Sequence, residues 1–396
     1  MNKNFTYFGK NPLFEKPKST SNLIRPDKEL FKKILKDSFD FKNAWFQEEK
    51  ILKHFENHFS ALHNTKHCIP IINGLWALVI TINELKLEGK TEIVMPSLTY
   101  RRMADIAAWT NLTPRFCDVN KDTFAISKEN VVKCINSETA LVLAPHPIVN
   151  ICDVEGITKL CNENNIPLLF DSVESYYADI NGKTVGSFGE AERFSLHASK
   201  FLNGFEGGYI TTNNDCLAYK LRIAANKGIV DGGHIKNFGF DLQMPAYHAA
   251  MALACLAEVD KQIAHNKSIY FAYQESLKDV EGLKLVEYNQ FEKRSFKNIL
   301  IELDDSWPIP REILIELMHK ENMLVRPYYF PPLHEMERQY KTIYSQLPNT
   351  EYWKKRMLLM PSGYFVSKTD VQLIVGFLNI CQANAKSILE NYDKSK

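Results

Sequence analysis

The sequence predicts an α/β protein: a large domain on a mainly parallel sheet, followed by a smaller α+β carboxyl-terminal domain. From about residue 50 to 250, short apolar segments alternate with segments whose apolar residues recur at helical spacing. That alternation stops at a long helical stretch, and 396 residues suffice for two cores. We therefore expect an amino-terminal segment (1–49), a large domain (50–250), and a connector helix with the small domain (251–396).

The predicted elements follow in order along the chain. Strands bounded by turn residues, with helices between them, imply a parallel sheet covered on both faces. The strands predicted for the large domain are 68–72, 91–100, 113–119, 139–147, 166–173, 191–198 and 207–213. The helices predicted before and between them are 29–39, 48–63, 74–85, 103–111, 128–136 and 154–165. Beyond residue 244 we expect helices at 245–279, 310–322 and 367–389 and strands at 296–303 and 323–330.

Composition excludes several classes of protein. The formal net charge is +1, so no basic field points to a nucleic-acid partner. No apolar run is long enough for a membrane span, and the stretch MNKNFTYFGKNP lacks the apolar core of a signal peptide. The eight cysteines form no C-x-x-C pair and the histidines show no metal-ligand spacing. We expect a cytoplasmic protein with reduced thiols and no metal site.

Lys200 stands in the stretch FSLHASKFLNGFEGG, among small and apolar residues and before a glycine-rich turn. A lysine held in a partly dry pocket has a depressed pKa and can attack a carbonyl carbon. The alternative is a surface lysine whose aliphatic stem covers apolar side chains. Taken alone, the segment favours this alternative, so the interpretation depends on the rest of the chain.

Two more polar features lie where predicted strands end, which is where ligands bind to open parallel sheets. Asp171 closes the apolar run IPLLF, and its alternative role is to cap the next helix. Asn73-Gly74 joins a strand to a helix, whose first N–H groups could bind a phosphate. An ordinary connecting turn is the alternative there. The phosphate loop of nucleoside triphosphatases is absent, as is a convincing G-x-G-x-x-G.

Five segments in order carry a family resemblance: VMPSLTY, TPRFCDVNKDTFAIS, LLFDSVES, VGSFGEAERFSLHASKFLNGFEGGYITTNN and RPYYFPPLH. Together they resemble the DegT/DnrJ/EryC1/StrS family of pyridoxal-phosphate-dependent aminotransferases, over most of the chain. The resemblance implies the aspartate-aminotransferase fold (fold type I). It also implies a homodimer with active sites at the subunit interface and pyridoxal 5'-phosphate as cofactor.

The resemblance assigns catalytic roles to two residues. Lys200 matches the lysine that forms an internal aldimine with the cofactor and then moves a proton. Asp171 matches the aspartate that keeps the pyridine nitrogen protonated, which makes the ring an electron sink. Tyr100 matches the aromatic residue that stacks on the ring, with core packing as its alternative.

The resemblance also implies a phosphate site. Gly74 and Leu75 stand where the family offers backbone N–H groups, and Ser195 matches a hydroxyl that binds the same phosphate. Asn226, in AANKG, matches an asparagine that reaches the phosphate from the neighbouring subunit. Turn chemistry is the alternative for Asn226, since it lies beside Lys227-Gly228.

The sequence departs from the family around the cofactor. Glu174 replaces a glutamine near the phenolic oxygen of the ring, and a carboxylate beside a phenolate is a like-charge contact in which one group should stay protonated. The alternative is that Glu174 points elsewhere. HPIVN, at 146–150, replaces H-x-Y-G, and Leu75 with Trp76 removes a hydroxyl from the phosphate turn. These changes put the substrate in doubt.

The resemblance implies a transaminase that moves an amino group from an amino-acid donor, with glutamate expected, to a keto-sugar, which we expect to be nucleotide-linked. Arg326, Tyr328 and His334 are substrate-site candidates, with domain packing as their alternative. A catalytically silent binding or regulatory protein and an enzyme for a smaller phosphorylated ketone stay open. Related sugar dehydratases carry histidine at the lysine position, so Lys200 argues against that activity.

Overall fold

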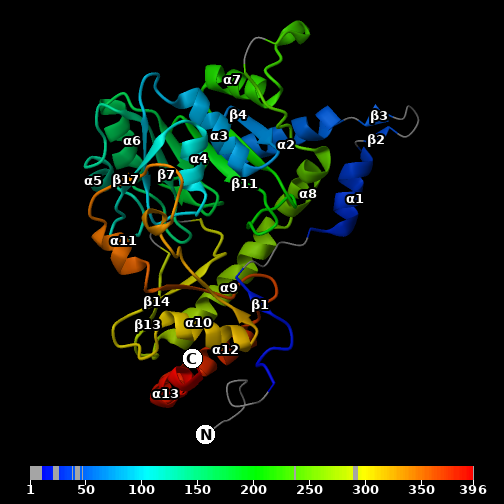
Figure 1. Ribbon diagram of the computed structural model, residues 1–396. Coiled ribbons are helices and arrows are strands. Elements are labelled where there is room, and N and C mark those ends of the chain that lie inside the picture. Colours follow the sequence, from blue (N-terminus) through cyan, green and yellow to red (C-terminus); the bar gives the residue numbers. More distant parts are fainter. Residues whose placement is uncertain are drawn as a thin grey trace.

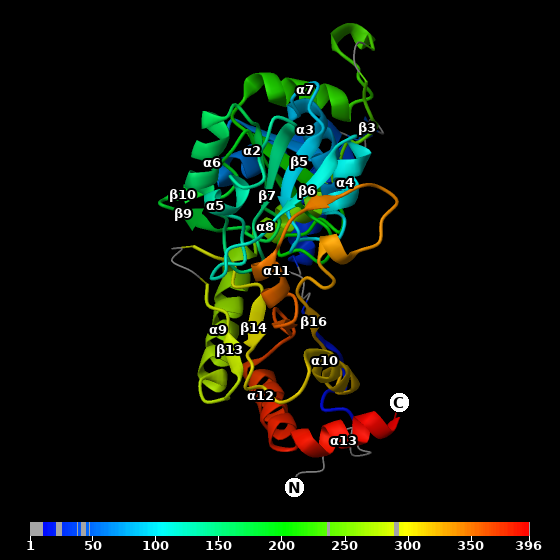
Figure 2. The same ribbon diagram turned by 60° about the vertical axis from the view of Figure 1, so that its left-hand side comes forward.

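The computed structural model describes residues 11–20, 26–37, 39–40, 45–46, 48–235, 238–288 and 293–395. The chain forms a large part around a sheet and a smaller part, which lies below the large one in both views and is joined to it by helix α9 (Val259–Leu277) (Figures 1 and 2). Residues 1–10, for which the sequence predicts no signal peptide, lie outside the described residues. None of the described helices is both long and apolar enough to cross a membrane.

Within the described residues the large part holds an eight-stranded sheet in the order β17-β6-β5-β7-β8-β11-β12-β4. β12 pairs antiparallel with β11 and β4, and the other strand pairs are parallel. This confirms the predicted fold class. The strands are β4 (His67–Ile71), β5 (Glu92–Pro96), β6 (Thr113–Cys117), β7 (Thr139–Pro145), β8 (Leu168–Asp171), β11 (Ala191–Ser195), β12 (Gly208–Thr212) and β17 (Ile343–Tyr344).

Helices cover both faces of this sheet, and strand residues alternate between two cores. Val94 of β5 faces one core, whereas its neighbours Ile93 and Met95 face the other. The first core also holds residues of α2 (Glu48–His63), α6 (Val154–Glu163) and α8 (Ala246–Leu256). The second core holds residues of α3 (Gly74–Leu85), α4 (Met103–Trp109) and α7 (Asp215–Ala225).

The small part has its own sheet and core. Its strand order is β13-β14-β18-β16, all antiparallel. Ile299 and Ile301 of β14 face the small core, whereas Leu300 faces the large one, so β14 lies between the two parts. The elements are β13 (Leu283–Leu285), β14 (Ile299–Leu303), β16 (Arg326–Pro327), β18 (Met357–Met360), α10 (Arg311–Lys320), α12 (Lys368–Ala383) and α13 (Ala385–Ser395).

The remaining short elements lie at the edges. β1 (Lys18–Ser19) pairs in parallel with β15 (Met323–Leu324), so part of the amino-terminal segment packs on the small part. The others are α1 (Lys28–Asp37), β2 (Phe39–Asp40), β3 (Trp45–Phe46), α5 (Lys128–Val131), β9 (Asp179–Ile180), β10 (Lys183–Thr184), η2 (Asp231–Gly233), η3 (Leu333–Glu335) and α11 (Pro348–Trp353).

Four predicted elements differ from the structure. The helix expected at 128–136 is only the short α5, Lys128–Val131. The connector at 245–279 is two helices, because α8 packs on the large sheet and α9 continues into the small part. The terminal helix breaks at Asn384, whose side chain donates to the carbonyl of Ile380 and so competes with the next helical turn. The strand expected at 323–330 is reduced to β15 and β16, since Pro327, Pro331 and Pro332 cannot donate to a ladder.

Candidate active site

A cavity of about 510 Å³ opens at the carboxyl ends of β4, β5, β7, β8 and β11. This is the edge at which parallel sheets bind ligands. Seven residues singled out from the sequence line it together: Gly74, Leu75, Tyr100, Asp171, Glu174, Ser195 and Lys200. The other lining residues are Asn73, Thr99, Pro145, His146, Val173, Arg193, His197, Ser199, Glu206 and Tyr329.

Lys200 lies in the turn after β11, and its side chain points toward an acid. Its Nζ is 2.6 Å from Glu174 Oε1, and 23% of the lysine side chain is exposed. The loop that follows turns back through Gly207, whose φ of 127° is open to glycine but strained for other residues. Gly208 then passes so close to α3 that a Cβ there would meet the Gly74 nitrogen at 2.6 Å. The glycines therefore bring β12 against the start of α3.

Glu174 connects the two parts of the molecule. Its Oε2 accepts from Lys297 Nζ at 3.2 Å and from Asn298 Nδ2 at 3.3 Å, both just before β14. Burial alone would raise the pKa of Glu174, but the Lys200 and Lys297 ammonium groups outweigh it and hold that pKa well below its usual range. Burial lowers the pKa of Lys297, although Glu174 opposes the shift. The carboxylate is thus ionised and flanked by two cations.

Asp171 is the last residue of β8 and is paired with an arginine. Arg193 Nη1 donates to Asp171 Oδ1 at 2.7 Å, and Arg193 Nε donates to the Gly74 carbonyl at 2.7 Å. The side chains of Asp171 and Arg193 are only 7% and 6% exposed. Asp171 therefore does not cap a helix, which was its alternative; it is a buried, ion-paired carboxylate on the cavity wall.

The start of α3 offers backbone donors to the cavity. The Asn73 side chain accepts from the Trp76 N–H at 3.0 Å, which caps the helix. The N–H groups of Gly74 and Leu75 in the first turn have no helical acceptor of their own. With Ser195 on the same wall, this end of the cavity suits an anion such as a phosphate.

Two further observations fit a bound aromatic cofactor. His146 is buried, and its Nδ1 accepts from the Cys152 N–H at 3.1 Å. Burial lowers the pKa of His146 to about 3, so the ring is neutral and carries its proton on Nε2, which has no partner among the described residues. A buried donor without an acceptor is unfavourable, and a ligand acceptor would relieve it. Tyr100 is 38% exposed at the cavity wall, which leaves a ring face available for stacking.

Four predicted site residues do not line the cavity. Asn226 ends α7 and pairs with Asp241 in a β-bridge. Arg326 is exposed on β16. Tyr328 is buried against the large part, where its hydroxyl accepts from the Ile148 N–H at 3.1 Å. His334 lies outside the cavity lining as well, and Tyr329, which follows Tyr328, lines the cavity instead.

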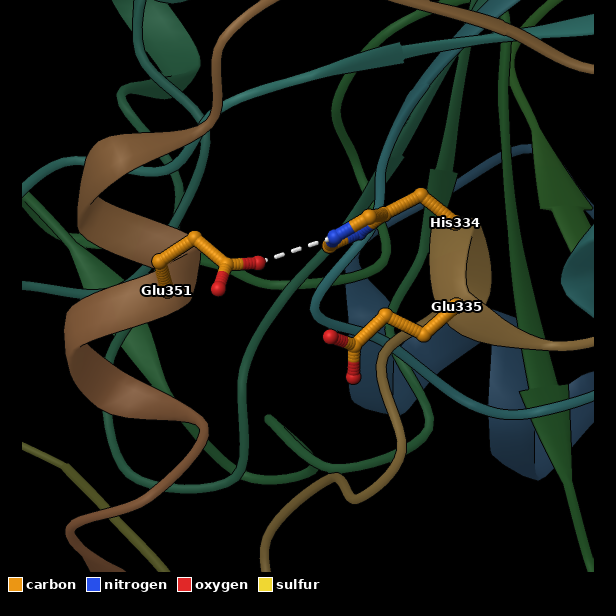
Figure 3. Close-up of side chains that lie close together, drawn as sticks. All are labelled: His334, Glu335 and Glu351. Atoms are coloured by element: carbon orange, nitrogen blue, oxygen red, sulfur yellow. Dashed lines mark hydrogen bonds and ion pairs between the residues drawn. The ribbon is translucent and has the colours of Figure 1, made fainter.

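His334 belongs to a separate cluster with Glu335 and Glu351 (Figure 3). Its Nδ1 bonds the Ser97 hydroxyl at 2.7 Å, and its Nε2 bonds Glu351 Oε1 at 2.9 Å. The Lys354 ammonium bonds both carboxylates, so a cation of the protein already offsets part of their charge. This cluster fixes the segment after β16 against the end of β5, which is the packing alternative.

Sequence reasoning missed several residues of the cavity. Arg193 stands beside Glu192 inside the strand AERFS, and two charged residues within a strand of a covered sheet were a usable signal. Lys297 and Asn298 directly precede the strand ILIEL, and nothing in the sequence indicated that they would reach Glu174. That contact depends on how the two parts pack.

The chain is similar to known aminotransferases over most of its length. The model of the family described as DegT/DnrJ/EryC1/StrS aminotransferase matches residues 29–379. GDP-perosamine synthase of Vibrio cholerae is 28% identical over 308 residues, which cover 76% of this chain and 82% of that protein. A dTDP-4-amino-4,6-dideoxy-D-glucose transaminase of Shigella dysenteriae is 24% identical over 265 residues, covering 67% of this chain and 72% of that one.

The fold is also found among solved structures. The crystal structure of DesI in the presence of its TDP-sugar product matches with a TM-score of 0.91 and 25% sequence identity. That alignment covers 99% of this chain and 100% of the other. The likeness therefore extends to both parts of the molecule.

Proposed function

The chain belongs to the DegT/DnrJ/EryC1/StrS aminotransferase family, and we propose that it transfers an amino group from glutamate to a nucleotide-linked keto-sugar. It is a pyridoxal-phosphate-dependent aminotransferase, as its sequence motifs indicated. The observation that carries the proposal is the meeting of Lys200, Asp171, Tyr100 and Ser195 around one cavity.

Each of these residues has a task toward the cofactor. Bound pyridoxal phosphate supplies an aldehyde that condenses with amines and a ring that accepts electrons. Lys200 Nζ would hold the cofactor and carry the proton of the substrate carbon. Asp171 would keep the pyridine nitrogen protonated, and Tyr100 would stack on the ring. Gly74, Leu75 and Ser195 would donate to the phosphate.

Glu174 and Lys297 form a supporting pair in this arrangement. A Lys200 Nζ that held the cofactor would no longer offset the Glu174 charge. Lys297 remains beside Glu174 at 3.2 Å and keeps the carboxylate ionised without a free Lys200. This pairing answers the like-charge problem that the sequence raised, because a cation accompanies the carboxylate.

The acceptor class follows from the relatives. GDP-perosamine synthase, the dTDP-amino-sugar transaminase and DesI with its TDP-sugar product are all named for nucleotide-linked sugars. They span most of this chain, which supports the same class of acceptor here. Six of the eight cysteines, all of which are described, are buried thiols; we place the enzyme in the reducing cytoplasm.

We further propose a homodimer whose subunits complete each other's sites. Phe238 is 83% exposed and Trp109 is 55% exposed, beside an apolar groove lined also by Trp76 and Phe240. The segment after α7 that includes η2 projects from the body in both views (Figures 1 and 2). Such a surface suits a second copy of the chain. Asn226, at the base of that segment, then serves the partner's phosphate site.

Spectroscopy of the purified protein tests the proposed function. The protein loaded with pyridoxal phosphate should be yellow, bleach with glutamate, and recover its colour only with an acceptor ketone. Nucleotide-linked keto-sugars should restore the colour faster than small phosphorylated ketones. Lys200→Ala should lower turnover by more than about 10³-fold, since it loses both attachment and proton transfer. A wild type that stays colourless with pyridoxal phosphate would favour the silent binding protein instead.

A further inference from the structure

Arg193 is a buried arginine in the middle of the large sheet. It is the third residue of β11, which runs between β8 and β12, and it is 5% exposed. A guanidinium group stays charged in proteins and carries five N–H donors. An arginine at such a position needs acceptors and negative charge around it.

Two of its three nitrogens have partners, Asp171 for Nη1 and the Gly74 carbonyl for Nε. Nη2 makes no hydrogen bond to any of the described residues. A Cβ built on Gly74 would stand 2.9 Å from Nη2 and 3.0 Å from Ser195 Cβ. The unpaired edge of the guanidinium therefore lies beside Gly74 and Ser195, where the phosphate donors converge.

The charge of a phosphate ester exceeds what the other donors offer. It is about −1.5 to −2 at neutral pH, whereas a helix N-terminus supplies about +0.5. Leu75 brings no polar group, and the Ser195 hydroxyl is neutral. The lysine on the cavity wall, Lys200, is paired with Glu174. Among the described lysines and arginines that line the cavity, Arg193 is thus the one beside the phosphate donors.

We propose that Arg193 binds the cofactor, with Nη2 donating to the phosphate while Nη1 holds Asp171 in place. The proposal rests on pyridoxal phosphate as cofactor and is independent of the acceptor. The Asp171 oxygen that does not accept from Arg193, Oδ2, is then left for the pyridine nitrogen. One side chain thereby links phosphate binding to the orientation of the carboxylate that governs the ring.

The contact of Arg193 with the phosphate can be distinguished from its contact with Asp171 by comparing two ligands of the apo-protein, one with a phosphate and one without. Pyridoxal phosphate and pyridoxal, which lacks the phosphate, are titrated into wild type and Arg193→Gln while tryptophan fluorescence is followed. Arg193→Gln loses a charged hydrogen bond worth about 1.5–3 kcal/mol, so the affinity for pyridoxal phosphate should fall about 10- to 100-fold. The affinity for pyridoxal should change by less than about threefold. Inorganic phosphate should compete with pyridoxal phosphate only in the wild type.

Control variants distinguish binding from folding. Arg115→Gln breaks another partly buried pair, with Glu92 at 2.5 Å, away from the cavity, and should leave both affinities unchanged. Arg193→Lys keeps the charge without the fork and should give intermediate affinity. Equal loss for both ligands, or no loss for either, would overturn the proposal. A wild type that binds no pyridoxal phosphate would overturn the proposed function too, whereas one that binds it without phosphate preference would overturn this inference alone.

Discussion

The carboxylate of Glu174 accepts hydrogen bonds from Lys200 in the large part and from Lys297 in the small part. Its side chain is 12% exposed, so solvent screens these contacts weakly. A carboxylate in that environment stays ionised because the Lys200 and Lys297 ammonium groups outweigh the cost of burial. The carboxylate would be unfavourable there if both cations were absent.

Replacing Glu174 with glutamine should make unfolding less sensitive to acid. The folded-state pKa of Glu174 is depressed below the ordinary value of about 4.3. At a pH below about 4.3 but above the folded-state pKa, Glu174 is protonated in the unfolded chain and ionised in the folded protein. The wild type therefore loses stability as the pH falls through this range. Glutamine does not titrate, so Glu174→Gln should lose up to about 1.4 kcal/mol less per pH unit there.

Urea unfolding at a series of pH values measures this slope. At neutral pH the variant leaves Lys297 buried without its carboxylate and should be less stable by about 3–5 kcal/mol. Glu88→Gln, an exposed change in the turn after α3, should follow the wild-type profile. Identical acid slopes for Glu174→Gln and the wild type would show that Glu174 is not paired in the folded protein.

Two helices of the large part begin with the same cap and differ in what they face. Asn73 accepts from the Trp76 N–H at the start of α3, and Asn214 accepts from the Leu217 N–H at the start of α7, both at 3.0 Å. Asn73 lines the cavity, whereas Asn214 does not. The first cap therefore positions the proposed phosphate donors, and the second supports structure alone.

Asn73→Ala and Asn214→Ala should each lower the free energy of unfolding by about 1 kcal/mol, the usual cost of losing a cap. Only Asn73→Ala should also lower the affinity for pyridoxal phosphate, by several-fold, because the first turn of α3 becomes less ordered. Thermal unfolding and fluorescence titration measure the two effects, and Asn73→Ser should restore both. Equal affinities in the two alanine variants would remove α3 from the cofactor site.

At the scale of the whole molecule, the site forms where the large and small parts meet. Lys297, Asn298 and Tyr329 come from the small part, and the other contacts come from strand ends of the large sheet. β14 faces both cores, so the two parts are coupled through the strand next to Lys297. A second chain is the remaining component, which we place at Asn226.

Mixing two inactive variants tests the shared site. Lys200→Ala and Asn226→Ala should each be impaired alone, the latter through weaker cofactor binding. In a mixed dimer, one site receives both changes and the other receives neither. Random exchange at equal amounts makes about half of the dimers mixed, so activity should recover to about a quarter of wild type. Absence of recovery in a mixture shown to exchange subunits would place Asn226 in its own chain's site, or in none.

The sequence alone was sufficient for the alternation of elements in the large part and for the motif positions at strand ends. Both depend on local patterns: apolar periodicity builds the strands and helices, and parallel strands necessarily bring their carboxyl ends to one edge. These patterns pointed to Gly74 and Asp171, and the family resemblance added Tyr100, Ser195 and the role of Lys200. All five line one cavity.

The tertiary structure decided which charges face these residues. Lys297 meets Glu174 from 123 positions away, and Arg193 reaches Gly74 across 119 positions. Such contacts depend on packing between strands and between the two parts, which no local pattern encodes. The same holds for His334. The segment RPYYFPPLH made it a substrate-site candidate, but its side chain packs on Ser97 and Glu351. Contacts between residues far apart in the sequence determine the charges around this site. Local sequence patterns determine where along the chain its residues lie.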